Sequence, residues 1–475
     1  MTQSESKVCH PLSAAQNGIL LAQVLDPISP QFNIGQYVSI QGRIEPVLFE
    51  RAVRLVVEEA DMLRVRLVEQ DDGQRQIIDP LFELSMPFGD VSSESDPEAA
   101  AIKWMKSDLT QTTDLARGPL FASILFQIAA DKFFWYLRCH HIITDGYGGG
   151  LFIRRVAEVY TAIVAGVPVQ QGRYSRLENL LEEDRNYRAS EQFQRDRQYW
   201  LNCMADCPVP VTLSTRAALT SGVAGPEWFL RRSAYLSGPT TASLRLSKTR
   251  RGADLPAMVA ATLAAYLYRL TNTRDLVLGL PVTGRIGALA RETPGMFSNV
   301  LPLRVFLHGN MRIVELVEQI AVEIGRSLRR QRYRFEDLRR DLGLLAHHNR
   351  LFGPTINVMR FDRPIQFAGC CAALHNLSNG PVDDLSFVIY DQSDNGQLRI
   401  DFDANPTLYT PEELDAHQER FLRLLEGIAR NPEQRIRDIE LLSAGERQQV
   451  VVEWNATAVE YERDECVHEL VEAQA

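Results

Sequence analysis

An apolar run that ends in two histidines limits the folds that this chain can adopt. Residues 132–139 are mostly apolar and lead directly into His140 and His141, after which four glycines between residues 146 and 150 interrupt the pattern. From residue 151 to residue 164, apolar residues recur with the period of a helix. This order predicts a buried strand, a glycine-rich turn and a helix, so we expect a mixed α/β fold.

The first third of the chain has the same mixed character. Ser13 stands where an N-cap belongs, and apolar residues at helical spacing follow it. Segments in which apolar and polar residues alternate, as in a strand, and segments with the amphipathic period of a helix then follow in turn. We expect helices from about residue 13 and over 45–60 and 97–109, and strands over 33–40, 62–68, 120–129 and 132–139.

The length of 475 residues exceeds the size at which a single hydrophobic core usually stops growing, so two lobes are expected. A long polar helix predicted over 175–204 places the lobe boundary near residue 172. We expect an N-terminal lobe over 1–172, a C-terminal lobe over 173–453 and a linker over 454–475. In the second lobe we expect helices over 258–270 and 411–429, strands over 275–280, 300–307, 355–361, 386–390 and 398–402, and a loop over 281–294.

Composition and charge argue against several classes of protein. The net charge of -10 is spread along the chain without a polybasic block, which disfavours nucleic acid or an anionic membrane surface as the main partner. The sequence has no run of about 18 apolar residues and no basic start followed by an apolar segment. The seven cysteines fit neither a disulfide framework nor a CxxC pair, so we expect a cytoplasmic protein.

The segment from His140 to Gly146 is the strongest candidate for chemistry. Successive side chains of a strand point to opposite sides, so His140 and His141 should face different ways and only one can readily serve a reaction. A neutral imidazole, with an ordinary pKa near 6.5, can accept a proton or donate a hydrogen bond. Asp145 could pair with an arginine, and Gly146 allows backbone torsions that a side chain would forbid.

The full pattern HHxxxDG after an apolar strand resembles the active-site motif of condensation domains in nonribosomal peptide synthetases. Other segments resemble further motifs of that family in the same order along nearly the whole chain. Two of them depart from the usual pattern, with Asn17-Gly18 in place of Arg-Leu and residues 59–61 in place of an Arg-His-Glu start. The matching segments are 13–16, 63–64, 187–200, 295–304, 330–336 and 351–357.

The resemblance implies two chloramphenicol-acetyltransferase-like lobes in a V, with the histidine motif at the middle of a tunnel between them. Donor and acceptor would arrive from opposite ends as thioesters on the phosphopantetheine arms of carrier domains. The α-amine of the acceptor would attack the donor carbonyl and form an amide. His141 is the histidine that the family would turn toward the tunnel, and we expect the domain itself to bind no cofactor and no metal.

The same resemblance assigns supporting roles to other residues. His140 and Asp145 would support the catalytic histidine, and Gly146 would offer its N–H near the oxyanion. Asp145 would form a structural ion pair with an arginine, for which Arg64 is the first choice and Arg285 the second. Ser298, Asn299 and Asn357 are candidates for the tunnel wall.

Several other functions stay open beside amide formation. A variant that also dehydrates a tethered serine or threonine would use the same histidine, and epimerization domains share HHxxxDG. A coenzyme A-dependent acyltransferase is a further alternative, although the Asp-Phe-Gly-Trp-Gly element of the plant type is missing. A non-catalytic scaffold is disfavoured by the intact motif, and heterocyclization is disfavoured because both histidines are retained.

Within the family, the chain resembles the enterobactin-synthetase type through residues 15–19, 351–354 and 380–385, which suggests an unusual donor such as an aryl acid. The tail from Trp454 resembles a linker into an adenylation domain. We therefore expect carrier domains and a downstream adenylation domain as partners, and a monomer for the excised domain. His347-His348 and Cys370-Cys371 carry no recognisable site pattern.

Overall fold

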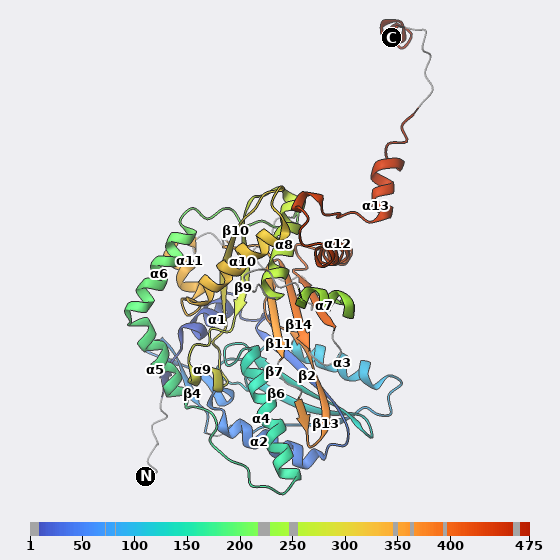
Figure 1. Ribbon diagram of the computed structural model, residues 1–475. Helices are drawn as coiled ribbons and strands as arrows, with labels where there is room; N and C mark the ends of the chain where they lie inside the picture. The colour runs from blue at the N-terminus through green and yellow to red at the C-terminus, as the bar shows by residue number, and fades with distance from the viewer. Residues whose placement is uncertain are drawn as a thin grey trace.

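The structure, a computed structural model, consists of two mixed α/β lobes stacked on each other (Figure 1). It describes residues 9–71, 73–80, 82–216, 229–246, 255–344, 350–361, 365–392, 397–458 and 466–475. Each lobe is built on one six-stranded sheet, and a three-stranded sheet lies beside the first. The expected α/β architecture of two lobes is confirmed.

The sheet of the N-terminal lobe has the strand order β12-β13-β2-β7-β6-β5. Strands β6 and β7 form the hairpin expected from the two apolar runs, and helices α2 and α4 pack on each other against the core of this lobe. The bounds are β1 His10–Pro11, α1 Ala14–Leu25, β2 Asn33–Gln41, α2 Pro46–Glu59, η1 Asp61–Arg64, β3 Val65–Gln70, β4 Gly73–Ile78, β5 Phe88–Asp90, α3 Pro97–Leu109, β6 Phe121–Ala129, β7 Lys132–His140 and α4 Gly146–Val164.

The sheet of the C-terminal lobe has the order β10-β9-β11-β14-β15-β8, and the apolar helix α8 is buried against it. Strand β11 pairs in parallel with both β9 and β14, while the remaining pairs of this sheet are antiparallel. The bounds are β8 Leu230–Tyr235, α7 Gly238–Leu246, α8 Leu255–Thr271, β9 Asp275–Val282, α9 Ala288–Glu292, β10 Asn299–Phe306, α10 Ile313–Leu328, α11 Phe335–Asp341, β11 Thr355–Phe361, β14 Leu385–Gln392, β15 Leu398–Ala404 and α12 Pro411–Arg430.

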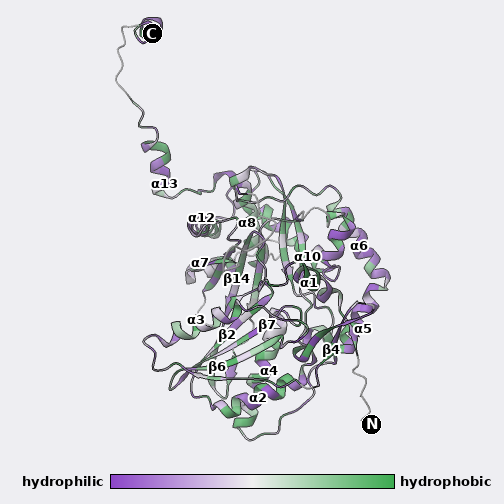
Figure 2. Cartoon of the chain, turned by 180° about the vertical axis from the view of Figure 1, so that it is seen from behind, coloured by the Kyte–Doolittle hydropathy of each residue, from purple (hydrophilic) through white to green (hydrophobic). Residues whose placement is uncertain are grey.

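Two helices, and not one, join the lobes. The predicted long helix over 175–204 is divided into α5, Leu177–Arg188, and α6, Glu191–Met204. Ser190 causes the break, because its hydroxyl accepts a hydrogen bond from the N–H of Phe193 at 3.3 Å and so caps a new helix. In Figure 2 these helices run along the outside of the molecule with many hydrophilic residues.

A strand from the C-terminal half of the chain lies in the sheet of the N-terminal lobe. Strands β12, Ile365–Phe367, and β13, Cys370–Ser378, extend that sheet, and β13 pairs with β2. The predicted division by a single boundary at residue 172 is therefore incomplete, because the crossover returns the chain to the first lobe. Its last residues reach the end of β7, where the two histidines lie.

The last segment leaves the C-terminal lobe beside α12. The short helix α13, Ala444–Gln448, is bound to α12 through Glu446 and Arg420 at 2.7 Å, and α14, Val467–Glu472, lies away from the body of the molecule (Figure 1). Along the described ranges, no helix is long and apolar enough to cross a membrane.

Candidate active site

His140 is the last residue of β7 and is turned into the N-terminal lobe, where it is 1% exposed. Its Nδ1 accepts a hydrogen bond from the N–H of Ile142 at 3.3 Å, so the proton of the neutral ring lies on Nε2, which donates to Oε1 of Gln23 at 3.1 Å. Burial lowers the pKa of His140 to about 3. The side chain is thus a neutral structural group that ties β7 to α1.

His141 faces the opposite way and lines a cavity. Its backbone N–H donates to the carbonyl of Phe32 at 2.7 Å, which fixes the chain just after the strand. Its Nδ1 is buried and meets no hydrogen-bond partner within the described residues. Burial lowers the pKa of His141, and the negative charge of Asp145 opposes that shift only in part, so the imidazole is neutral near pH 7.

Asp145 is the N-cap of α4 and is 2% exposed. Its Oδ1 accepts from the N–H of Gly148 at 2.8 Å and from the guanidinium of Arg285 at 2.8 Å. Its Oδ2 accepts from the N–H groups of Phe297 and Ser298, both at 3.0 Å. Four donors saturate the carboxylate, so Asp145 supports the site and has no lone pair left for proton transfer.

The partner of Asp145 is Arg285, and the first choice from the sequence, Arg64, was wrong. Arg64 lies at the end of η1 and binds Asp61 at 2.9 Å, three residues earlier. Arg285 reaches Asp145 from the C-terminal lobe, and its guanidinium lies 4.8 Å from the ring centroid of Tyr147 and 4.4 Å from that of Phe297. Aromatic neighbours suit a buried guanidinium.

Two glycines bring the backbone close to His141. Gly146 begins α4, and within the described residues its N–H meets no acceptor. Gly380, after β13, has φ +100, and a Cβ at that position would lie 3.1 Å from Cδ2 of His141. The chain can pass so close to the imidazole only because residue 380 has no side chain.

Two cavities meet at this part of the molecule. The histidine cavity, of about 610 Å³ including open solvent, is lined by His141, Asp145, Gly146, Leu63 and Pro294 among others. The α5 cavity, of about 690 Å³, is lined by the neighbouring residues Met62 and Gly295 and by residues of α1 and α5. Segments 62–63 and 294–295 thus contribute to both cavities.

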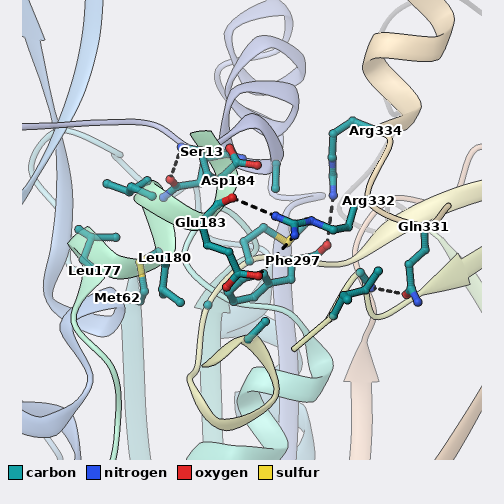
Figure 3. Close-up of a pocket in the computed structure, with 18 residues that line it drawn as sticks. Ser13, Met62, Leu177, Leu180, Glu183, Asp184, Phe297, Gln331, Arg332 and Arg334 are labelled. Atoms are coloured by element: carbon teal, nitrogen blue, oxygen red, sulfur yellow. Dashed lines mark hydrogen bonds and ion pairs between the residues drawn. The ribbon is translucent and has the colours of Figure 1, made fainter. Parts of the chain in front are cut away.

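The α5 cavity has a charged rim (Figure 3). Arg332 donates to the carbonyl of Glu183 at 3.0 Å and approaches its carboxylate at 3.4 Å, while Asp184 accepts from the N–H of Ala14 at 2.9 Å. Arg334 donates to the carbonyl of Ser298 at 2.7 Å. These contacts connect α1, α5 and the loops of the second lobe around the cavity.

The three tunnel candidates do not line either cavity. Asn299 is instead a buried bridge, since its amide donates to the carbonyls of Gln331 and Tyr333 and accepts from the N–H of Phe335. Ser298 donates a hydrogen bond from its backbone N–H to Asp145, and Asn357 lies on β11. Asn299 was proposed for the tunnel wall, but its amide is occupied by these hydrogen bonds within the second lobe.

Gln36, Met359, Asn376 and Asn379 also line the histidine cavity and were not predicted from the sequence. No local motif marks them, because Gln36 reaches the cavity through the pairing of β2 with β7, Met359 comes from β11 of the other lobe, and the crossover of β13 brings Asn376 and Asn379. Cys370 and Cys371 are free thiols at the start of that strand. His347-His348 lies outside the described residues. No group of three or more potential metal ligands occurs among the residues with described positions.

Comparison with known proteins agrees with this geometry. The sequence model of the Condensation domain family matches residues 7–451. The dimodular nonribosomal peptide synthase of Bacillus subtilis (strain 168) is 43% identical over 449 residues, which are 94% of this chain and 19% of that protein. Enterobactin synthase component F of Escherichia coli (strain K12) is 30% identical over 452 residues, which are 95% of this chain and 34% of that protein.

Among solved structures, the starter condensation domain of the rhizomide synthetase RzmA, a mutant in complex with C8-CoA, superposes with a TM-score of 0.86. It is 44% identical, and the match covers 92% of this chain and 98% of that domain. The chain spans only a small part of the two synthetases that it resembles, whereas it matches almost all of the solved domain.

Proposed function

This chain belongs to the condensation-domain family of nonribosomal peptide synthetases, whose members are amide-bond-forming acyltransferases, and we propose that it joins two carrier-bound thioesters. The donor is an acyl or peptidyl group, and the acceptor is an aminoacyl group with a free α-amine. The observation that carries the proposal is the neutral imidazole of His141 on the wall of a cavity. The fully hydrogen-bonded carboxylate of Asp145 and the backbone of Gly146 line the same cavity.

In the proposed reaction, the lone pair of the acceptor amine forms a C–N bond with the donor carbonyl carbon. Collapse of the tetrahedral intermediate breaks the C–S bond and releases the phosphopantetheine thiolate. The proton that leaves the nitrogen passes to the imidazole of His141 and from there to the departing sulfur. Thioester aminolysis is intrinsically easy, so holding both groups in place supplies a large share of the acceleration.

The remaining site residues position these groups. The N–H of Gly146 begins a 19-residue helix, so it lies where a negative charge on the carbonyl oxygen is stabilised. Asp145 and Arg285 hold the turn that carries His141 and Gly146 against the loop 295–298. Both residues are positioning residues, because the carboxylate of Asp145 is saturated and Arg285 lines neither cavity.

A soluble acyl-coenzyme A is a second candidate donor. The observation that favours it is the similar RzmA domain, which was solved with C8-CoA. Coenzyme A ends in the same phosphopantetheine arm as a carrier, so the two donors differ in what anchors the arm and share the chemistry at His141. Competition between the same acyl group on a carrier and on coenzyme A distinguishes them.

The test uses donor and acceptor carriers loaded with thioesters and follows the acceptor by intact-mass spectrometry. Transfer should add the donor mass to the acceptor, and a further loss of one water would indicate dehydration. His141→Ala should reduce transfer at least a hundredfold, a typical contribution of a general base. His308→Ala, at an exposed histidine remote from both cavities, is the matched control. Full transfer by His141→Ala would refute the proposed role.

The wider assignments follow from the same proposal. We propose carrier domains and a downstream adenylation domain as partners, a cytoplasmic location, a monomeric excised domain, and no cofactor beyond the carrier arms. Size-exclusion chromatography with and without each carrier tests the partners and the oligomeric state.

A further inference from the structure

The histidine cavity has an apolar body. Side chains of Leu63, Phe121, Leu137 and Phe152 line it together with Cys139, whose thiol has its pKa raised to about 12 by burial and is therefore un-ionised. Glycines at 146, 148 and 149 complete the wall without adding side chains of their own. A ligand here gains free energy by burying apolar surface.

Most polar groups on the wall are already satisfied by the protein. Asn376 accepts from Arg231 at 3.1 Å and donates to Asn379 at 2.9 Å, and Asn379 donates to the hydroxyl of Tyr390 at 3.0 Å. Ser378 donates to the carbonyl of Asn33 at 2.9 Å. These groups form the wall and have little capacity left for a ligand.

Gln36 is different, because its side-chain amide meets no partner among the described residues although it lines the same wall. It lies on the face of β2 that carries the buried Val38 and Ile40. A Cβ at Gly149 would lie 2.8 Å from Nε2 of Gln36, so the amide fills the space left by this glycine. Gln36 is only half-buried, and an amide on the cavity wall without a protein partner is available to hydrogen-bond a ligand.

The cavity also has no free negative charge. Asp145 is the only charged residue on its described wall, and its four lone-pair positions are occupied by Gly148, Arg285, Phe297 and Ser298. A substrate ammonium group would lose its hydration here without gaining a counter-ion.

We propose that the histidine cavity holds the body of the donor acyl group and selects an uncharged acyl chain that bears a hydroxyl group for Gln36. The inference rests on the proposed function. A donor carbonyl between His141 and the N–H of Gly146 directs its acyl body into this cavity, toward Phe121 and Phe152. The amide of Gln36 can both accept from and donate to a hydroxyl group.

The test compares octanoyl, hydroxyoctanoyl and aminooctanoyl thioesters on the donor carrier, with the substituent at C2 or at C3, and one loaded acceptor. For one of the two positions, the hydroxyl should raise kcat/KM about two- to tenfold over octanoyl, the range of a single neutral hydrogen bond. The ammonium analogue should be transferred at least about a hundredfold more slowly, because its charge is buried without a partner.

Two variants assign the preference to Gln36. In Gln36→Leu the ratio of hydroxyoctanoyl to octanoyl transfer should fall to about one, and Gln36→Glu should raise aminooctanoyl transfer relative to octanoyl. Gln41→Leu, the same change at the exposed end of the same strand, should keep the ratio of the parent protein.

A ratio of one in the parent protein, an unchanged ratio in Gln36→Leu, or equal transfer of the ammonium donor would overturn the inference while leaving amide formation intact. Absence of transfer from every donor, with both carriers loaded, would overturn the proposed function and with it the inference.

Discussion

The guanidinium of Arg285 lies 2.8 Å from the carboxylate of Asp145, although 140 residues separate the two in the chain. Both side chains are almost fully buried, at 1% and 2% exposure. Arg285 also donates to the carbonyls of Gly295 and Thr293, so the pair connects the turn after His141 to the loop that divides the two cavities.

Removing one member of this pair should strongly destabilise the protein. Arg285→Ala leaves a buried carboxylate without its cation and should lower the free energy of unfolding by about 3–5 kcal/mol, measured by denaturant titration. Arg326→Ala, which breaks an exposed ion pair with Glu323, should change it by less than about 1 kcal/mol. Equal effects of the two substitutions would contradict the structural role of Arg285.

Acid should destabilise the protein through His140. Its pKa is about 3 in the folded chain and near 6.5 when unfolded, so below pH 6.5 the unfolded state binds a proton that the folded state does not. Stability therefore falls as the pH drops from 6.5 toward 3, and this residue contributes a slope of about 1.4 kcal/mol per pH unit. His375 and His417, both with a pKa of about 4 through burial, add to the slope.

Unfolding measured between pH 7 and pH 5 checks this effect. His140→Gln should reduce the mean slope over this range by about 1 kcal/mol per pH unit, whatever it does to the stability at pH 7. His308→Gln, at an exposed histidine, should keep the slope of the parent protein. The assignment fails if His140→Gln leaves the slope unchanged.

The rate of transfer should fall in two steps as the pH is lowered, which gives the pH profile two acid limbs. The first comes from the acceptor α-amine, with an ordinary pKa near 8, and it should remain in every variant. The second comes from His141, and it should begin below pH 6.5 because burial keeps the imidazole neutral to lower pH. Single-turnover rates with both carriers saturating measure the profile. A second limb that begins above pH 6.5 would contradict the lowered pKa of His141.

The crossover strand should depend on Arg231. This side chain makes a two-point contact with Asp403 at 2.6 and 2.7 Å and donates to Asn376 of β13 at 3.1 Å, beside a register shift in that strand. Arg231→Met should increase hydrogen exchange in residues 376–380 and lower kcat for transfer, because the wall beside His141 loses its anchor.

The neighbouring residue offers a matched control for this experiment. Arg232 lies on the same strand as Arg231, and Arg232→Met removes its more exposed ion pair with Asp415 of α12. It should leave the exchange of residues 376–380 unchanged. Equal protection of these residues in both variants would show that Arg231 does not anchor the crossover.

Elements with a strong local pattern were predicted well from the sequence. The helix over 97–109 and the hairpin of β6 and β7 agree with the structure to within a residue or two, since each depends on hydrophobic period and local turn signals. The helix break at Ser190 was missed, because the polar pattern continues across it. Strand β13 and helix α10 were left unassigned.

Local sequence was enough to place the two histidines at a strand end, followed by the glycines and Asp145, because a strand, a turn and a helix are specified by neighbouring residues. The alternation of side chains along a strand was also enough to predict that His140 and His141 face opposite ways. Tertiary contacts select the arginine that reaches Asp145, make Asn299 a bridge, and bring Gln36, Asn376 and Gly380 to the cavity or the ring of His141. These relationships join segments up to several hundred residues apart. They arise from the packing of the two lobes, the pairing of β2 with β7 and the crossover of β13, for which no local pattern exists.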